Sequence, residues 1–342
     1  MVENEFTAEE AALYDRQIRL WGLDAQKRLR AAKVLIAGLG GLGAEVTKNL
    51  VLAGIHSVTL LDHHNVSELD YTSQFLLSRE DLGKNRAESS LSHTQQLNPR
   101  VNVVVDKDSI QDKGEEFFKT FDVVCLTGYY SLDVLFFINN TCRKHNIKFY
   151  CGGVWGFFGY VFTDLGKQHT FVEEIPVKIE QPVYGESGEP MPKKPRSEEK
   201  TTQMVKKTVE FVPLEKALAV KSGKAGVGID RRTSSIFLLT HVLFRFLSNH
   251  KRPPLPQNRT TDTAELIKLR DETLDDLGVD RTRLGDVFLD KTFGELSPIC
   301  AVVGGVLSQD IIKAVSAKDA PLKNFFLFDG QDGSGVVEHF GR

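Results

Sequence analysis

The chain has 342 residues, 41% hydrophobic and 26% charged, which is enough for one large or two ordinary domains with a sizeable core. Its formal net charge of −3 gives no general attraction to nucleic acid or to an anionic membrane. The acidic start, MVENEFTAEEAA, lacks an apolar stretch and predicts no secretory signal. No uninterrupted apolar run reaches the roughly 18 residues that span a membrane, so we expect neither nucleic acid nor membrane as partners.

The cysteines are Cys125, Cys142, Cys151 and Cys300, and no two of them form a C-x-x-C pair. We therefore expect no zinc site and no other metal site in this chain. Cys125 and Cys151 lie in apolar, strand-like runs, which indicates packed thiols in a reduced compartment, cytosol or nucleus. A catalytic cysteine is not excluded by the count alone.

The first half of the chain alternates between helical and strand-like patterns. Thr7-Ala-Glu-Glu10 fits a capping box and predicts a helix over residues 7–32. The alternation that follows is typical of a doubly wound, mainly parallel sheet with helices on both faces, and the core of the nucleotide fold is expected over 33–175. The expected strands are Lys33–Gly38, Ser57–Asp62, Val101–Val105, Asp122–Leu126 and Lys148–Cys151, and the expected helices are Ala44–Ala53, Lys84–Asn98, Glu115–Thr120 and Leu132–His145.

The second half departs from this alternation. The glycine- and aromatic-rich GGVWGFFGYVFTD predicts an antiparallel extension. A polar stretch over 180–203 is expected to be a flexible insertion, because it has too few apolar residues to offset the conformational entropy lost on ordering. Its basic cluster, Lys193 to Arg196, is either solvated charge or a nuclear signal. Over 207–342 we expect a strand at Lys207–Val212, helices at Arg232–Ser248, Ala264–Leu277 and Pro298–Val315, and two strands around a glycine turn in NFFLFDGQDGSGVVEHF. The whole of 1–342 is interpreted as one domain.

The stretch KVLIAGLGGLG places Gly38, Gly40 and Gly43 in the spacing G-x-G-x-x-G between a strand and a helix. That geometry lets backbone N–H groups approach a phosphate. A nicotinamide-dependent oxidoreductase is one interpretation, because Asp62 ends the second strand where a carboxylate holds a ribose hydroxyl. No acid–base constellation for hydride transfer supports it.

Longer segments resemble a particular family. YDRQIRLWG at 14–22, GLGGLGAEVTKNLVLAG at 38–54, and the SQFLL and LGKNRAE segments are similar to the adenylation domain of the ubiquitin-like-protein activating enzymes. That superfamily, of the ThiF type, includes bacterial adenylating proteins of molybdopterin and thiamin synthesis. The resemblance implies a Rossmann-like adenylation fold, in which a C-terminal glycine carboxylate attacks the α-phosphate of MgATP.

The chain departs from the active members of this family at the positions that handle ATP. The resemblance implies a ribose-binding Asp, an Asn, an Arg, a Lys and a magnesium-binding Asp. At these positions the chain has His64, Asp70, Ser73, Arg86 and the segment Leu126-Thr127-Gly128-Tyr129-Tyr130, while Asp62, Gln74 and Phe75 are retained. Asp70 in place of Asn is expected to add negative charge near the position of a triphosphate. Losing one charge-stabilising group of this kind typically removes about 3 kcal/mol of transition-state stabilisation. We therefore expect a vestigial crevice that binds no cofactor, with Gly38, Gly40, Gly43 and Asp62 as structural remnants. The alternative is a diverged working site in which Arg86 or Lys84 replaces the lost Lys.

The family resemblance also implies a partner. Such domains pair around a pseudo-two-fold axis, and the N-terminal helix of one half reaches the ATP site of the other. The matching residue is Arg16, which is expected to contact ATP in trans. Arg19, one turn further on, is a second candidate for the same site or for the interface. The chain is then the non-catalytic subunit of a heterodimer. A larger catalytic subunit would hold MgATP and the thioester cysteine, the ubiquitin-like protein would bind through the complex, and the location would be mainly nuclear, with some cytoplasmic.

Overall fold

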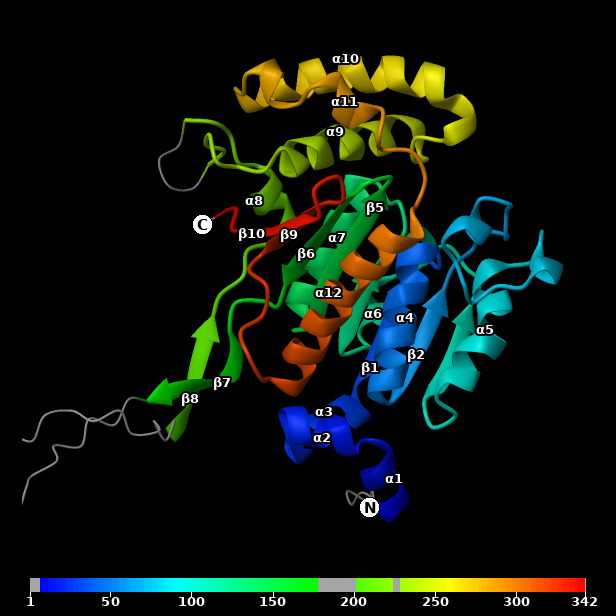
Figure 1. Ribbon diagram of the computed structural model, residues 1–342, viewed down its shortest axis with the longest axis vertical. Helices are drawn as coiled ribbons and strands as arrows, with labels where there is room; N and C mark the ends of the chain where they lie inside the picture. The colour runs from blue at the N-terminus through cyan, green and yellow to red at the C-terminus, as the bar shows by residue number, and fades with distance from the viewer. Residues whose placement is uncertain (1–6, 178–200, 224–227, 342) are drawn as a thin grey trace, which may run out of the picture.

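A single eight-stranded sheet forms the centre of the computed structural model, which describes residues 7–177, 201–223 and 228–341 (Figure 1). Five neighbouring strands are parallel, and three antiparallel strands extend one side of the sheet. This confirms the doubly wound, mainly parallel sheet with an antiparallel extension. Across the sheet the strands are β10 (Ser334–Glu338), β9 (Phe325–Asp329), β6 (Phe158–Asp164), β5 (Lys148–Trp155), β4 (Val123–Leu126), β1 (Lys33–Ala37), β2 (Ser57–Leu61) and β3 (Asn102–Asp106).

Helices cover both faces of the sheet. Their bounds are α1 (Ala8–Leu13), α2 (Asp15–Trp21), α3 (Leu23–Ala31), α4 (Gly41–Ala53), α5 (Arg86–Leu97), α6 (Glu115–Phe118), α7 (Leu132–Lys144), α8 (Leu214–Leu218), α9 (Ser235–His250), α10 (Arg259–Leu277), α11 (Asp286–Leu289) and α12 (Ser297–Ser316).

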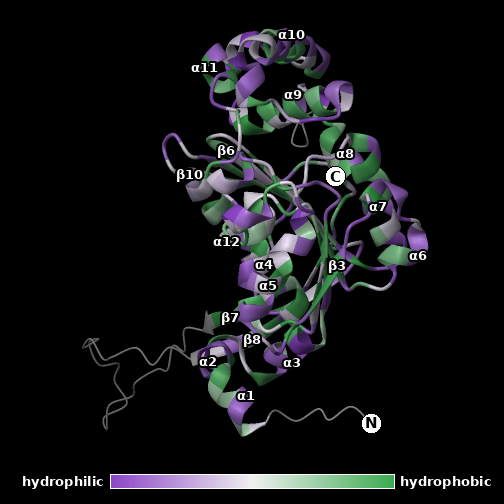
Figure 2. Ribbon diagram, turned by 90° about the vertical axis from the view of Figure 1, so that its right-hand side faces the viewer, coloured by the Kyte–Doolittle hydropathy of each residue, from purple (hydrophilic) through white to green (hydrophobic). Residues whose placement is uncertain are grey.

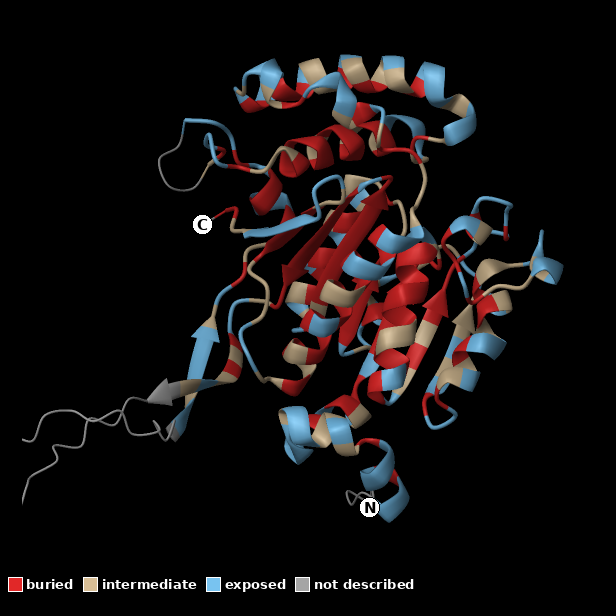
Figure 3. Cartoon of the chain, in the orientation of Figure 1, coloured by how far each residue is buried: buried red, intermediate tan, exposed pale blue. Residues whose placement is uncertain are grey.

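The sequence of β1 shows why both faces are apolar. Successive side chains of a strand point to opposite faces, and every residue of β1 after Lys33 is buried. Val34 and Ile36 belong to the hydrophobic cluster under α4 and α12, whereas Leu35 and Ala37 belong to the cluster under α7 and α9. Figure 3 shows the central strands buried along most of their length, and Figure 2 shows hydrophobic residues concentrated in the sheet.

Helix α12 lies in the first of these layers. It is 20 residues long with a mean hydropathy of 1.5, so by length and composition it meets the criterion for a membrane span. Gln309, Asp310 and Lys313 interrupt it, so it does not contradict the expectation that no uninterrupted apolar run reaches this length. Of its 18-residue apolar window, 61% is buried within the fold, where Gly304 packs so closely on α4 that an added Cβ would lie 2.6 Å from the Cβ of Glu45. These contacts identify α12 as a core helix of the domain.

The N-terminal segment is three short helices rather than one helix over 7–32. The capping box of Thr7 and Glu10 is present, but the chain bends at Tyr14 and again at Gly22, whose φ of +90° is unfavourable for other residues. Tyr14 is buried, and its hydroxyl accepts a hydrogen bond of 2.8 Å from Asn98. Anchoring this aromatic ring against the domain fixes the first bend.

Two strands, β7 and β8, flank the polar insertion, and the second strand starts within the range expected to be flexible. Strands β7 (His169–Val177) and β8 (Thr201–Val209) form a separate antiparallel pair that projects from the body of the domain (Figure 1). Residues 201–203, which were assigned to the flexible insertion, therefore belong to β8, and the strand expected at Lys207–Val212 starts earlier. The rest of the insertion, with the basic cluster Lys193 to Arg196, lies outside the described residues.

Most other expected elements are confirmed within a few residues. Helix α4 starts at Gly41 rather than Ala44, α10 starts at Arg259 rather than Ala264, and β5 continues to Trp155. The two strands around the glycine turn of the tail are β9 and β10. The four cysteines are buried and unbridged, and burial raises the pKa of Cys125, Cys142 and Cys151.

The glycine loop is tightly packed in its own right. Gly38 has a φ of +94°, and an added Cβ would lie 2.3 Å from the backbone nitrogen of Gly128. At Gly43 an added Cβ would lie 2.0 Å from the carbonyl oxygen of Gly38. These glycines are therefore needed for close packing of α4 against the strand ends, whether or not a nucleotide binds.

Replacing Gly43 with Ala should lower the free energy of unfolding by about 1–3 kcal/mol through overpacking. The matched control is Gly305→Ala in α12, where an added Cβ has no atom within 4 Å. There the better helix propensity of Ala should leave stability unchanged or raise it by up to about 1 kcal/mol. Urea unfolding of the two variants measures this difference, and equal effects would contradict the packing account.

Candidate functional site

A crevice of about 640 Å³ lies at the carboxyl ends of the parallel strands, where doubly wound sheets bind their ligands. The glycine loop and the segment Thr127–Tyr130 form its floor. Its walls come from residues 64–73, from the turn at 251–256 and from residues 292–298, which lead into α12. The sequence analysis placed the site here, and the structure brings Gly38, Gly40, Ser73, Arg86 and Asp70 together around it.

The carboxylate of Asp62 is fully engaged inside the protein. The guanidinium of Arg86 bonds it at 2.7 Å, and the same guanidinium bonds Asp70 at 2.7 Å. Backbone N–H groups of Leu39 and His64 donate to the remaining lone pairs of Asp62 at 2.6 and 3.0 Å. The residue that would bind a ribose therefore has no acceptor position left for one.

These contacts set the charge states of the cluster. Burial alone would raise the pKa of Asp62, but the hydrogen bond from His64 and the positive charge of Arg86 outweigh it, so the pKa falls well below its usual range. Burial alone would lower the pKa of Arg86. The nearby carboxylates of Asp62 and Asp70 outweigh this effect, so the pKa of Arg86 lies above its usual value. Asp62 and Arg86 are therefore both ionised at neutral pH.

Asp70 and Arg86 behave differently from the sequence-based expectation. Asp70 was expected to add negative charge beside a triphosphate, yet Arg86 neutralises it, and both the N–H and the hydroxyl of Ser67 donate to it at 2.7 Å. Arg86 in turn is held by two carboxylates rather than directed at a ligand. Lys84, the other suggested substitute, has an exposed side chain that bonds Asp81.

A second carboxylate occupies the glycine loop itself. Glu295, in the segment before α12, accepts the N–H of Gly41 at 2.5 Å, and the hydroxyl of Ser73 lies 3.4 Å away. An added Cβ on Gly40 would lie only 2.7 Å from the same carboxylate oxygen. The pKa of Glu295 is raised above its usual value, because the effect of burial exceeds the opposing effect of the hydrogen bond from Gly41. In nucleotide-binding folds, the first free N–H of the equivalent helix donates to a phosphate. Here the first N–H of α4, that of Gly41, donates to the Glu295 carboxylate instead.

The retained Gln74 has a supporting position. Its side-chain amide donates to the carbonyl of Leu39 at 3.1 Å and to Ser90 at 3.0 Å. It therefore anchors the glycine loop to α5. The hydroxyl of Thr127 similarly donates to the carbonyl of Gly38 at 2.6 Å.

One group near the crevice has the composition of a metal site. Ligand atoms of Asp62, His63 and His64 lie within 4.8 Å of one another. A cation there would face the guanidinium of Arg86, which already bonds Asp62 at 2.7 Å and would repel it. The arrangement therefore disfavours a divalent ion.

Arg16 lies far from this crevice along the sheet. Helix α3 ends just before the amino end of β1, whereas the glycine loop follows the carboxyl end of that strand. The five residues of β1 alone correspond to roughly 16 Å. Figure 1 shows α1–α3 at one end of the molecule and α9–α11 at the other. Arg16 is exposed and pairs with no described carboxylate, whereas Arg19 bonds Asp15 at 3.0 Å.

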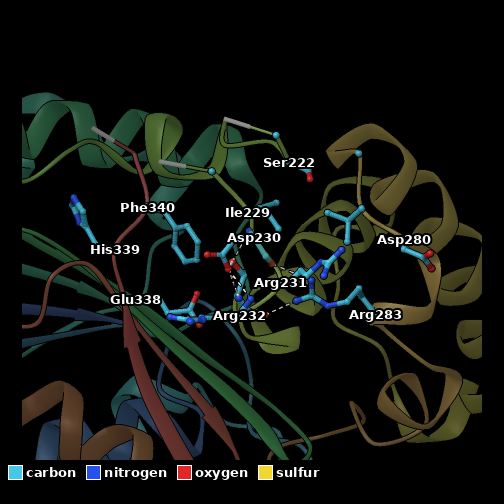
Figure 4. A pocket seen from close by; sticks show the side chains of 15 residues that line it. Ser222, Ile229, Asp230, Arg231, Arg232, Asp280, Arg283, Glu338, His339 and Phe340 are labelled. Atoms are coloured by element: carbon cyan, nitrogen blue, oxygen red, sulfur yellow. Dashed lines mark hydrogen bonds between the residues drawn. The ribbon is translucent and has the colours of Figure 1, made fainter. Parts of the chain in front are cut away.

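A second hollow, of about 1070 Å³, lies between the start of α9 and the end of β10 (Figure 4). Its carboxylates cap local backbone: Asp230 accepts the N–H of Thr233 at 2.9 Å, and Glu338 accepts the N–H of Ser234 at 2.8 Å. Arg283 donates to the carbonyl of Asp230 at 3.0 Å. Sequence reasoning did not indicate this hollow, and these contacts stabilise the turn before α9.

Comparison with known proteins identifies the family of this chain. The ThiF family profile matches residues 14–339. The chain belongs to the ThiF family. Proteins named SUMO-activating enzyme subunit 1 are similar to it over their whole length. Those of Xenopus tropicalis and Homo sapiens are each 47% identical over 348 residues, covering 100% of this chain and 99% of the relative. The Danio rerio protein is 47% identical over 334 residues, covering 97% and 95%.

The ThiF fold is also seen in a distant solved structure. Escherichia coli MccB, crystallised with succinimide, superposes with a TM-score of 0.55 at 15% identity, covering 99% of this chain and 73% of that one. Within the ThiF family, the stretches IRLWGLDAQKRLR, SPICAVVGGVLSQDIIKA and NFFLFDG predict a likeness to the smaller subunit of the SUMO-activating enzyme. The relatives confirm a likeness to subunit 1.

Sequence reasoning missed Glu295. The residue lies more than 250 positions after the loop that it contacts, and no spacing rule joins the two. The available signal was a lone carboxylate in FGELSP directly before an apolar helix. Only the packing of α12 against α4 brings it to Gly41.

Replacing Asp62 with Asn should destabilise the protein by about 3 kcal/mol at neutral pH, because Arg86 loses one of two buried counter-charges. Since folding lowers the pKa of Asp62, its contribution is present above the unfolded pKa of about 4 and is lost as the pH falls below it. Urea unfolding at a series of pH values should therefore show the stability difference between the two proteins shrinking as the pH falls from about 4 toward the much lower pKa of Asp62 in the folded protein. A difference that does not change with pH would contradict the ion-pair account.

Proposed function

We propose that the chain is the non-catalytic subunit of a heterodimeric SUMO-activating enzyme. In this proposal the larger catalytic subunit binds MgATP, adenylates the C-terminal glycine of SUMO and then forms a thioester on its own cysteine. This chain binds no cofactor and supports adenylation through the dimer interface. A mainly nuclear location, with some cytoplasmic, is part of the same proposal.

The internal contacts at the crevice support the proposal most directly. Arg86 takes the acceptor atoms of Asp62 that a ribose would use, and Glu295 takes an N–H that a phosphate would use. The Thr127–Tyr130 segment offers no carboxylate to a magnesium ion. ATP binding would have to displace both internal contacts and place a triphosphate beside a carboxylate.

Two alternatives fit the crevice less well. An independently active ThiF adenylyltransferase needs free cations at the phosphates, yet Arg86 is held by two carboxylates. An NAD(P)-dependent oxidoreductase needs Asp62 for the ribose, and the same ion pair occupies it. The family assignment also favours acyl adenylation over hydride transfer.

The position of Arg16 supports a role in trans. It lies at the end of the sheet opposite its own crevice, so it cannot serve that crevice. Three leucines on the same helices are strongly exposed: Leu13, Leu20 and Leu23, at 55%, 68% and 44%. Exposed apolar side chains beside an unpaired guanidinium suit a surface that docks on another protein.

A second exposed apolar surface supports the dimer. Val302 on α12 and Phe75 are 42% and 44% exposed, and Lys48 of α4 lies 5.1 Å from the centre of the Phe75 ring. Helices α4 and α12 pack side by side (Figure 1). We assign this surface to contact with the adenylation domain of the catalytic subunit, which a pseudo-two-fold pairing would place against a similar surface.

ATP–pyrophosphate exchange with SUMO tests the proposal. The chain alone should give no exchange above background, and the mixture with the catalytic subunit should be active. Exchange by the chain alone would mean that Arg86, Asp62 and the glycine loop form a working site.

Replacing Arg16 with Ala should slow exchange by the heterodimer by about 100-fold, as expected for losing one charge that stabilises the transition state. Dimer formation, followed by size-exclusion chromatography, should be unchanged. The matched control is Arg281→Ala, which removes an exposed arginine outside α1–α3 that pairs with Asp275 and should leave the rate unchanged. An unchanged exchange rate in the Arg16 variant would contradict the proposal that Arg16 contacts ATP bound to the catalytic subunit.

A further inference from the structure

Glu295 has an unusual position for a carboxylate. Its oxygen is bonded to the N–H of Gly41 at 2.5 Å, at the start of the 13-residue helix α4, and it is close to Gly40 in the glycine loop. The residue reaches this position from the far end of the sequence, through the segment between α11 and α12. A parallel bridge between Gly156 and Glu295 fixes that segment to the end of β5.

The chemistry of this position favours an anion. The start of a helix carries free N–H groups and a positive partial charge, and glycines leave space for an oxyanion to approach the backbone. A carboxylate satisfies the same N–H that a phosphate oxygen would. The small side chain of Ser73, where active relatives of this fold are expected to carry Arg, leaves space for it and places a hydroxyl 3.4 Å away.

We infer that Glu295 is an internal oxyanion ligand, which holds the glycine loop in its nucleotide-binding shape and excludes phosphate from it. This inference rests on the proposed function, because it identifies the side chain that keeps this crevice free of nucleotide. A phosphate cannot share the position, since two anions would meet at hydrogen-bond distance from one N–H. Arg86 cannot compensate, because Asp62 and Asp70 both hold it.

Removing the carboxylate should therefore leave a loop that accepts an added oxyanion. In Glu295→Ala of the full-length chain, the midpoint of thermal unfolding should fall, and inorganic pyrophosphate should raise it again by about 3 °C or more. Sodium chloride at the same ionic strength should not. Isothermal titration calorimetry should show pyrophosphate binding at least tenfold more tightly to the variant than to the wild type.

Glu338→Ala is the matched control. Glu338 also accepts a backbone N–H, that of Ser234 at 2.8 Å, and burial likewise raises its pKa, but it lies in the second hollow, away from the glycine loop (Figure 4). Its variant should be destabilised without rescue by pyrophosphate. Equal rescue of both variants would show a general salt effect and overturn the inference.

Glu295→Gln covers the case in which the alanine variant does not fold. It keeps the size and an acceptor oxygen for Gly41 but removes the charge, so it should fold and bind pyrophosphate more tightly than the wild type. Unchanged affinity in a folded Gln variant would overturn the inference and leave the proposed function intact. Tight pyrophosphate binding by the wild type would contradict both.

Discussion

The ion pair of Arg86 with Asp62 and Asp70 determines what this crevice can do. Nucleotide folds commonly keep the carboxylate after the second strand free for a ribose. Here that carboxylate is buried, and its lone pairs are used by Arg86, His64 and Leu39. Breaking such a pair is costly, because it leaves an uncompensated charge inside the protein. The other contacts of the crevice also hold its polar groups inside the protein. Gln74 and Thr127 bond the glycine loop, and Glu295 accepts the N–H of Gly41 where a phosphate oxygen would bind.

The same fold separates two functions along the sheet. At the carboxyl ends of the strands, charged side chains neutralise one another, and the glycines serve packing. At the amino end, the short N-terminal helices carry exposed leucines and Arg16, which pairs with no carboxylate of the described residues. A fold that keeps its glycine loop but uses the polar groups of its own crevice for internal contacts, while presenting a cation at the opposite end, is suited to completing the site of a partner. Under the proposed function, ATP would bind at only one place in the heterodimer.

Much of the architecture follows from local patterns. The buried run of β1, the glycine spacing and the segment YDRQIRLWG predict the parallel sheet, the loop and the family, because each depends on neighbouring residues. Tyr14 and Gly22 were present in that segment, yet the bends they cause depend on contacts with Asn98 and on backbone shape. Substitutions such as Ser73 for Arg predict a lost activity, but they do not show what replaces the lost ligand. The bonds from Arg86 to Asp70 and from Glu295 to Gly41 depend on tertiary packing, so sequence reasoning assigned Asp70 a free charge and overlooked Glu295.

The central claim is that this chain contributes structure and Arg16, while nucleotide binds only to the catalytic subunit. The most direct test is to titrate the purified heterodimer with MgATP by calorimetry and determine the number of sites. The account predicts one site per heterodimer, which is lost when the nucleotide site of the catalytic subunit is inactivated by mutation. Two sites, or one site that survives that mutation, would show that the crevice around Asp62 and Arg86 binds nucleotide and would contradict the account.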